Sequence, residues 1–102
     1  MDPERLSDIQ IADVVIATAG REKGKLFYVL NVEDQYLLLV NGKDRTLEQP
    51  KRKKLRHVEK VLRAETRVAL KLRNSDKVLN SELRRDLAYL GREMQSNNLG
   101  GF

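Results

Sequence analysis

The sequence predicts a mainly β protein: a small barrel of five short strands, followed by a helical segment that packs on it. Between residues 9 and 61, short apolar runs alternate with turn signals, a spacing typical of small barrels. After residue 61 the apolar residues recur at helical spacing instead. We expect an N-terminal tail at 1–8, the barrel at 9–61, a helical extension at 62–96 and a flexible tail at 97–102.

The apolar pattern places the first three strands. The first lies within residues 9–18, and the second covers about 26–32. A polar loop, AGREKGK, joins them. The third strand, YLLLV at 36–40, is apolar throughout, which favours cover on both of its faces.

The dipeptide Asn41-Gly42 is a strong hairpin signal, because both residues of the tight turn must accept positive φ. It predicts a fourth strand at about 44–49 that ends at Pro50, which cannot donate to a ladder. The basic run at 51–54 is then expected to follow this strand as a solvated segment. The alternation in LRHVEKV, residues 55–61, predicts the fifth strand.

One apolar stripe predicts the C-terminal helix. Its members recur every three or four residues and are Leu79, Leu83, Leu87, Leu90 and Met94. Asn80 or Ser81 can cap this helix, and Glu82 is favourable in its first turn. The stretch 65–73 is ambiguous, because its apolar residues alternate as in a strand and also share a helix face.

The positive charge lies mainly in the middle of the chain. The net charge is +5, and residues 43–63 carry nine Lys and Arg against three Asp and Glu. This distribution predicts an anionic polymer as partner. The chain has no cysteine, which excludes disulfides and fits a reducing compartment. It shows no secretory signal and no apolar run of membrane-spanning length, so we expect a cytoplasmic protein without a membrane partner.

Catalytic and metal-binding patterns are missing from the sequence. A single histidine, His57, and no cysteine make a zinc site improbable. Neither GxxxxGK[ST] nor GxGxxG occurs, and no nucleophile lies beside a base. The carboxylates of Glu82 and Asp86 share a helix face with Arg85 alongside, as in a solvated charge ladder. We therefore expect no enzymatic activity, no catalytic residue, no metal and no cofactor.

The AGREKGK loop is the first candidate binding site. Gly20 and Gly24 permit positive φ or a close backbone approach, and the loop carries Arg21, Lys23 and Lys25. Backbone amides and cations on a short loop between two strands suit a phosphate chain. The alternative is an ordinary solvated hairpin tip.

The stretch VVIATAGREKGKLFYVLNV resembles a KOW motif, in which a glycine-framed basic loop separates two strands. With the continuation YLLLVNG, RTLE and PKRKKLRH, residues 9–58 are similar to the bacterial KOW-domain RNA-binding proteins. These in turn resemble the KOW-containing large-subunit ribosomal proteins of archaea and eukaryotes. The chain departs from the pattern at Glu22 and Asn41, where Asp is more usual, and at Ile11-Ala12, which replaces a glycine-containing start of the first strand.

The resemblance implies an SH3-like barrel that binds structured RNA, ribosomal RNA above all, in a ribosomal-protein-like role in translation. It also favours a helical hairpin over 65–95. The candidate RNA-binding residues are Arg21, Lys23, Gly24, Lys25, Lys43, Arg45, Lys51, Arg52, Lys53, Lys54, Arg56 and His57. Phe27, Tyr28 and Tyr36 are the rings available to unpaired bases, and we expect core packing for most of them.

Two other functions stay open. A KOW barrel also serves as a protein-interaction module, which here would bind ribosomal or transcription proteins and have little affinity for free RNA. A purely structural ribosome-associated role is the third reading. In each case we expect a monomer.

Overall fold

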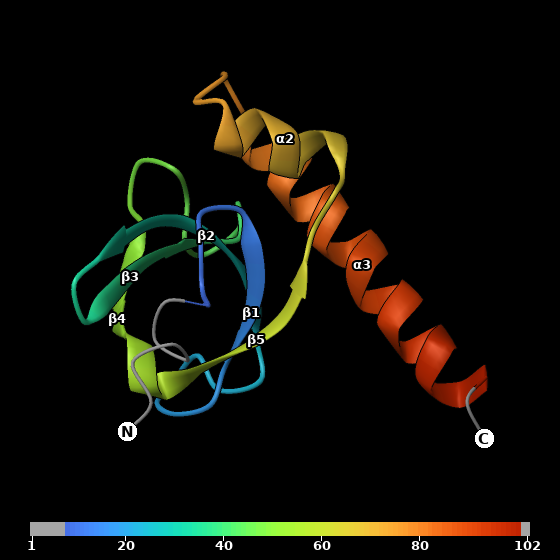
Figure 1. The fold of residues 1–102 in the computed structure, drawn as a ribbon. Coiled ribbons are helices and arrows are strands. Elements are labelled where there is room, and N and C mark those ends of the chain that lie inside the picture. The colour runs from blue at the N-terminus through green and yellow to red at the C-terminus, as the bar shows by residue number, and fades with distance from the viewer. Residues whose placement is uncertain (1–7, 101–102) are drawn as a thin grey trace.

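The computed structural model describes residues 8–100, with side chains described as far as Gln95. Within these residues, strands come first and helices follow (Figure 1). The elements are β1 (Asp13–Ala17), β2 (Leu26–Glu33), β3 (Tyr36–Val40), β4 (Lys51–Lys54), the 3-10 turn η1 (Leu55–His57), β5 (Val58–Arg63), α2 (Arg67–Arg73) and α3 (Asn80–Gly100). The chain is therefore mainly β with a helical C-terminal part, as predicted.

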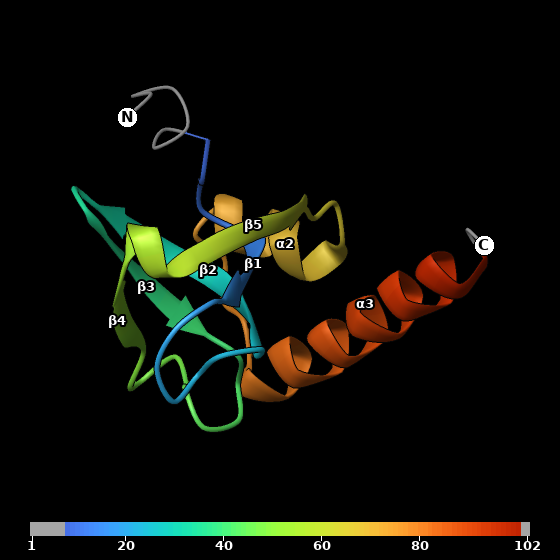
Figure 2. The same ribbon diagram turned by 90° about the horizontal axis from the view of Figure 1, so that it is seen from below.

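The strands form one antiparallel sheet in the order β4-β3-β2-β1-β5. Val14 of β1 pairs with Tyr28 of β2, which pairs in turn with Val40 of β3. On its other side Val14 pairs with Leu62 of β5. β4 and β5 are the two edges, and no ladder joins them within residues 8–100. The sheet is curled but not closed (Figures 1 and 2).

Both faces of the sheet are buried, because the residues of a strand point alternately to its two sides. One core fills the inside of the curl and consists of Ile9, Val15, Ala17, Phe27, Val29, Leu37, Leu39, Leu55 and Val58. The other lies between the sheet and the helices, where Val14, Tyr28 and Val40 pack against residues of α2 and α3. The predicted cover on both faces of β3 holds for Leu37, Leu39 and Val40, while Tyr36 and Leu38 are only half-buried.

The two helices cover the outer face of the sheet, and α3 runs on past its edge (Figures 1 and 2). Thr66 caps α2 by accepting a hydrogen bond from Ala69 N at 3.2 Å. The ambiguous stretch is thus a helix over 67–73, as the resemblance favoured. Leu83, Leu87 and Leu90 are the buried part of the α3 stripe. Neither described helix is both long enough and apolar enough to cross a membrane.

A polar network connects the sheet to both helices. The Tyr28 hydroxyl donates a hydrogen bond to Asp86 of α3 and lies 3.0 Å from Thr66 Oγ1. Thr66 Oγ1 also donates to Asp86 Oδ2 at 2.8 Å. Burial and the nearby carboxylate raise the pKa of Tyr28, so its hydroxyl stays protonated and able to donate. The network holds the start of α2 and the middle of α3 on β2.

The predicted fourth strand at 44–49 is wrong. Residues 41–50 form an irregular loop, and the fourth strand is the basic run itself, after Pro50. Gly42 has φ +76°, but a Cβ there would lie 2.1 Å from Asn80 O. The glycine thus allows the start of α3 to pack on the loop, and Arg84 Nη1 donates to Gly42 O at 2.6 Å. This packing takes precedence over the hairpin preference of Asn-Gly.

Element boundaries differ in several places. β1 begins only at Asp13, because Ala12 has φ +72° and interrupts an extended chain. β5 begins at Val58, since η1 occupies 55–57. The helix α3 continues to Gly100, through the first residues of the expected tail. The rest of that tail, 101–102, and most of the N-terminal tail lie outside the described residues.

The start of α3 is also stabilised differently from the prediction. Asn80 does not act as the cap: its Oδ1 accepts a hydrogen bond from Leu47 N at 2.9 Å, and its amide donates to Glu48 at 2.8 Å. Instead Glu82 accepts from Leu79 N at 3.0 Å. Leu79, placed in the apolar stripe by its spacing, is 51% exposed.

We predict that Leu87→Ala lowers the free energy of unfolding by about 2–5 kcal/mol, because it leaves a cavity between helix and sheet. Leu79→Ala is the matched control, with an expected change below about 0.5 kcal/mol at an exposed site. Urea unfolding followed by circular dichroism measures both variants. Equal stability of the two would show that α3 does not belong to the core of this domain.

Candidate nucleic-acid interface

The loop at residues 18–25 joins β1 to β2 in a conformation that requires its glycines. Gly20 and Gly24 have φ of +77° and +87°, which L residues with a side chain rarely adopt. Gly24 N donates to Ala17 O at 2.8 Å, and Lys23 N donates to Gly20 O at 3.2 Å. A Cβ on Gly24 would meet no atom within 4 Å. The predicted positive φ is confirmed. At Gly24 the backbone conformation alone requires a glycine, because the space around the position is not crowded.

A buried carboxylate organises the loop. Glu22 is only 4% exposed, and Arg45 holds its Oε1 with hydrogen bonds from Nη2 at 2.6 Å and from Nε at 3.2 Å. Lys25 Nζ lies 3.5 Å from the other carboxylate oxygen. The hydrogen bonds from Arg45 lower the pKa of Glu22 below its ordinary value, in spite of its burial. The carboxylate therefore stays ionised, and the loop is tied to Arg45.

A second ion pair connects the same two loops. Lys25 Nζ donates to Asp44 Oδ2 at 2.6 Å, and the Asn41 amide donates to Asp44 Oδ1 at 2.8 Å. The hydrogen bond from Lys25 is the main cause that lowers the pKa of Asp44 to about 2. Lys25 and Arg45, both candidate RNA ligands, thus have carboxylate partners inside the protein. Their positive charge stabilises the loops and is less available to an external anion.

The other two cations of the loop remain exposed. Arg21 and Lys23 flank the buried Glu22 and point to solvent. Neither forms an ion pair within the described part of the chain. Because Glu22 anchors the backbone between them, the loop presents these two side chains from a fixed position.

The basic run at 51–54 is the edge strand β4, and its side chains therefore alternate between two faces. Lys51 and Lys53 pair with Leu39 and Leu37, on the side of the inner core. We expected the whole run to be solvated, but Lys53 is buried, with 8% of its surface exposed. A Cβ added at Gly20 would lie 3.4 Å from Lys53 Nζ, so this ammonium group reaches the glycine loop.

The outer face of β4 carries exposed cations, and an aromatic ring of β3 lies beside them. Arg52 and Lys54 pair with Leu38 and Tyr36 of β3. The Arg52 guanidinium lies over the Tyr36 ring, 3.7 Å from its centroid, and Arg52 Nε lies 3.4 Å from Glu33 Oε1.

A cleft of about 320 Å³ opens beside this ring, between the end of β4 and the turn that follows β2. It is lined by Gln35, Tyr36, Lys54 and Arg56. Lys54 and Arg56 are exposed, and neither has an ion-pair partner among the side chains that the structure describes.

The fold brings the two basic segments of the sequence side by side. Lys53 reaches Gly20, as described, and Thr18 N donates to His57 O at 2.9 Å. The loop 18–25 therefore lies against β4 and η1, although some thirty residues separate them in the sequence. Figure 1 shows this loop passing below η1. His57 itself is half-buried and contributes its backbone to this contact.

Lys43 lines a second hollow, together with Lys25. It is exposed on the 41–50 loop, where a groove of about 460 Å³ separates the loop from α3. The floor of the groove is apolar, formed by Leu26, Leu87 and Ala88, and Arg84 stands at its rim.

Sequence reasoning missed the role of Glu22, which it read only as a loop residue. No pattern in the sequence shows that this carboxylate is buried. Nor does any pattern show that it pairs with Arg45, more than twenty residues further along the chain. It also missed that the basic run is a strand. One signal was present, since Pro is found at the first residue of strands and on edge strands, and Pro50 directly precedes the run.

Within residues 8–100, no three His, Asp or Glu side chains are grouped as a metal site would require. The exposed cations of the site suit binding of an anion. Compared with known proteins, the sequence matches neither a protein-family model nor a curated protein.

We predict that Glu22→Gln destabilises the protein by about 1–3 kcal/mol at pH 7, because it removes charged hydrogen bonds from Arg45. Folding lowers the pKa of Glu22 and of Asp44. Their contribution is therefore present at neutral pH. That of Asp44 is lost as the pH falls from about 4 toward 2, and that of Glu22 as the pH falls through its lowered pKa.

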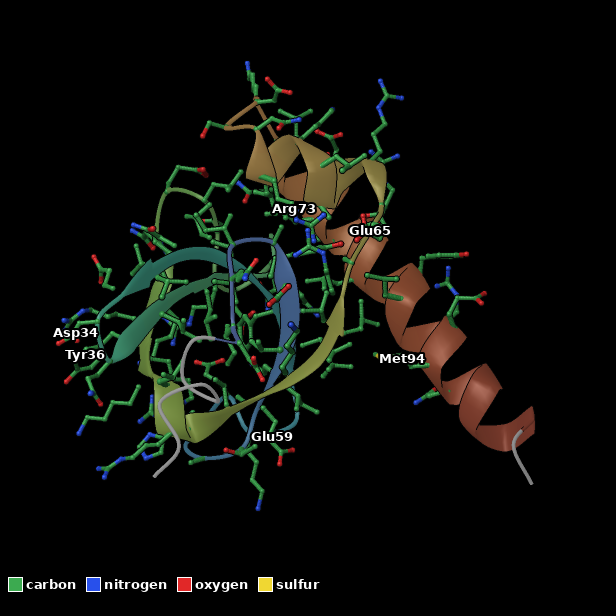
Figure 3. All side chains as sticks on the ribbon, in the orientation of Figure 1. Asp34, Tyr36, Glu59, Glu65, Arg73 and Met94 are labelled. Atoms are coloured by element: carbon green, nitrogen blue, oxygen red, sulfur yellow. The ribbon has the colours of Figure 1, made fainter. Side chains whose placement is uncertain are left out.

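Urea unfolding between pH 7 and pH 2 measures this dependence. The parent protein should lose stability over the acid range more steeply than Glu22→Gln. Glu59→Gln is the control, because Glu59 is exposed at the surface (Figure 3). The same acid dependence in all three proteins would contradict the role assigned to Glu22.

Proposed function

We propose that this chain is a non-catalytic RNA-binding protein of the KOW type, which binds structured RNA and ribosomal RNA above all. The observation that carries the proposal is the contact between the two basic segments, the loop 18–25 and the stretch 51–57. Arg21 and Lys23 project from the loop, and Lys54 and Arg56 from the neighbouring strand end. Four exposed cations without carboxylate partners in the described residues match the spaced phosphates of a folded nucleic acid.

The arrangement of the strands supports the KOW part of the proposal. A glycine-framed loop between two adjacent antiparallel strands, β1 and β2, is what the resemblance implies. The order β4-β3-β2-β1-β5, with η1 turning the chain from one edge strand to the other, is compatible with an SH3-like barrel that is open between β4 and β5. We propose this barrel as the fold.

Recognition in this proposal depends on charge and shape. Phosphates carry no sequence information, and the deep major groove of an RNA helix resists reading by side chains. A loop fixed by the Glu22–Arg45 ion pair loses little conformational entropy when it meets the RNA backbone. Binding should therefore depend on salt and on RNA structure more than on sequence.

The test is a salt series of RNA affinity for the parent and for a variant with Arg21, Lys23, Lys54 and Arg56 changed to Ala. Each neutralised phosphate contributes about 0.7–0.9 to the slope of log affinity against log salt. We predict that the variant loses about 2–3 units of slope. Lys53 is left intact, because it is buried and belongs to the sheet.

A charge-matched control separates local contacts from net charge. Arg67, Lys77, Arg85 and Arg92 are exposed on the helical part of the chain, and their change to Ala removes the same charge. This control should keep most of the parental slope. Equal losses in both variants would mean that only net charge attracts RNA, and a parent without salt-dependent RNA affinity would refute the proposed function.

The groove beside α3 favours a second candidate function, a protein-interaction module. Its apolar floor and the cations at its rim, Lys43 and Arg84, suit an acidic segment with apolar side chains on a partner of the translation or transcription machinery. The salt series discriminates between the candidates, because a protein-interaction module predicts little affinity of the parent for free RNA.

A further inference from the structure

We propose that Tyr36 and Arg52 form a stacking platform for one unpaired base of the RNA, with Lys54 and Arg56 holding the flanking phosphates. The inference rests on the proposed function and adds to it a subsite for single-stranded nucleotides. It makes the outer face of β4 the place where the protein distinguishes unpaired RNA from a continuous duplex.

Tyr36 is the ring of the sheet that remains available. Phe27 and Tyr28 are fully buried, one in each core. Tyr36 is half-buried at the first position of β3. Figure 3 shows it beside Asp34 at the end of the sheet, on the opposite side of the molecule from α3. Neither α2 nor α3 covers this end (Figures 1 and 3), so a base can approach it.

Arg52 extends the ring into a layered surface. Its guanidinium lies 3.7 Å from the centroid of Tyr36, the distance of a stacked pair, and Glu33 lies 3.4 Å from its Nε. Bases stack on aromatic side chains and on guanidinium planes alike. Because Arg52 is already positioned in the free protein, the platform is preorganised, and little ordering is needed when a base binds.

The cleft beside Tyr36 has the chemistry of a nucleotide site. Its volume of about 320 Å³ lies at the small end of ligand pockets. Lys54 stands directly opposite Tyr36 in the β3–β4 register, and Arg56 follows two residues later. A base on the ring would thus have a cation for the phosphates on either side of it. Leu55 N donates to Gln35 O at 2.8 Å, which fixes the two walls of the cleft relative to each other.

A site of this kind selects unpaired RNA. In a duplex every internal base is stacked on its neighbours and has no free face for a side chain, whereas bases in loops and bulges can be turned outward. Contacts to phosphates alone would not require a base with a free face. A difference between single-stranded and duplex RNA is therefore the property that this platform adds.

The experiment compares Tyr36→Ala and Tyr36→Phe at constant salt, with three probes of equal length. These are a mixed-sequence single-stranded RNA, a blunt duplex RNA and an abasic oligonucleotide. Loss of one base–aromatic stack lowers affinity by about 5- to 100-fold. We predict this loss for Tyr36→Ala with single-stranded RNA alone. Tyr36→Phe should bind like the parent, because the ring is kept and the hydroxyl is not needed.

Arg52→Lys provides a second variant at a position that is exposed, so that folding is not at risk. It keeps the charge but loses the planar group, and it should weaken binding of single-stranded RNA without changing the salt slope. An unchanged affinity of Tyr36→Ala for single-stranded RNA would overturn the platform, as would an equal loss with duplex or abasic probes. In those cases salt-dependent binding by the parent would leave the proposed function standing, whereas a parent that binds none of the probes would refute both.

Discussion

The structure depends on one constraint: a single small sheet must have both of its faces covered. The chain meets this constraint in two ways. The inner face is covered by the curl of the sheet itself together with η1, and the outer face, around β1, β2 and the end of β3, by α2 and α3. Alternating side chains of β1 and β2 serve both cores, which explains why β1 and residues 26–30 of β2 contain no exposed residue. Groups that bind a partner are therefore confined to loops, to edge strands and to the helix surface.

This constraint determines where positive charge can act. Among the cations near the loops, two are held by carboxylates, Lys25 by Asp44 and Arg45 by Glu22, and Lys53 is buried. These three shape the interface, while the exposed cations around them form its surface. A residue's charge alone thus does not assign it to binding, because the internal partners decide which cations an external anion can reach.

The architecture was predictable from local patterns where the pattern is strong. The apolar runs of β2 and β3 and the stripe of α3 indicate their elements directly, since burial requires these periods. The prediction failed where contacts between residues far apart in the sequence determine the local structure. The Asn41-Gly42 signal is overridden by the packing of α3 on Gly42, and the burial of Glu22 depends on Arg45 from another loop.

The basic run shows the same limit. Four consecutive cations suggest solvent on all sides, yet an edge strand can bury one of them and align the others. The candidate site was thus predictable as a set of cations, but its division into structural and exposed members required the fold.

The central claim is that RNA binds along loop 18–25 and the outer face of β4. It is tested most directly by titrating the isotopically labelled protein with an RNA that has a single-stranded loop and following backbone amide shifts by NMR. The account predicts that the largest shifts occur at residues 20–24, at 52–56 and at Tyr36, with little change on the helices. Shifts concentrated at 41–44 and 84–88, around the groove beside α3, would contradict it.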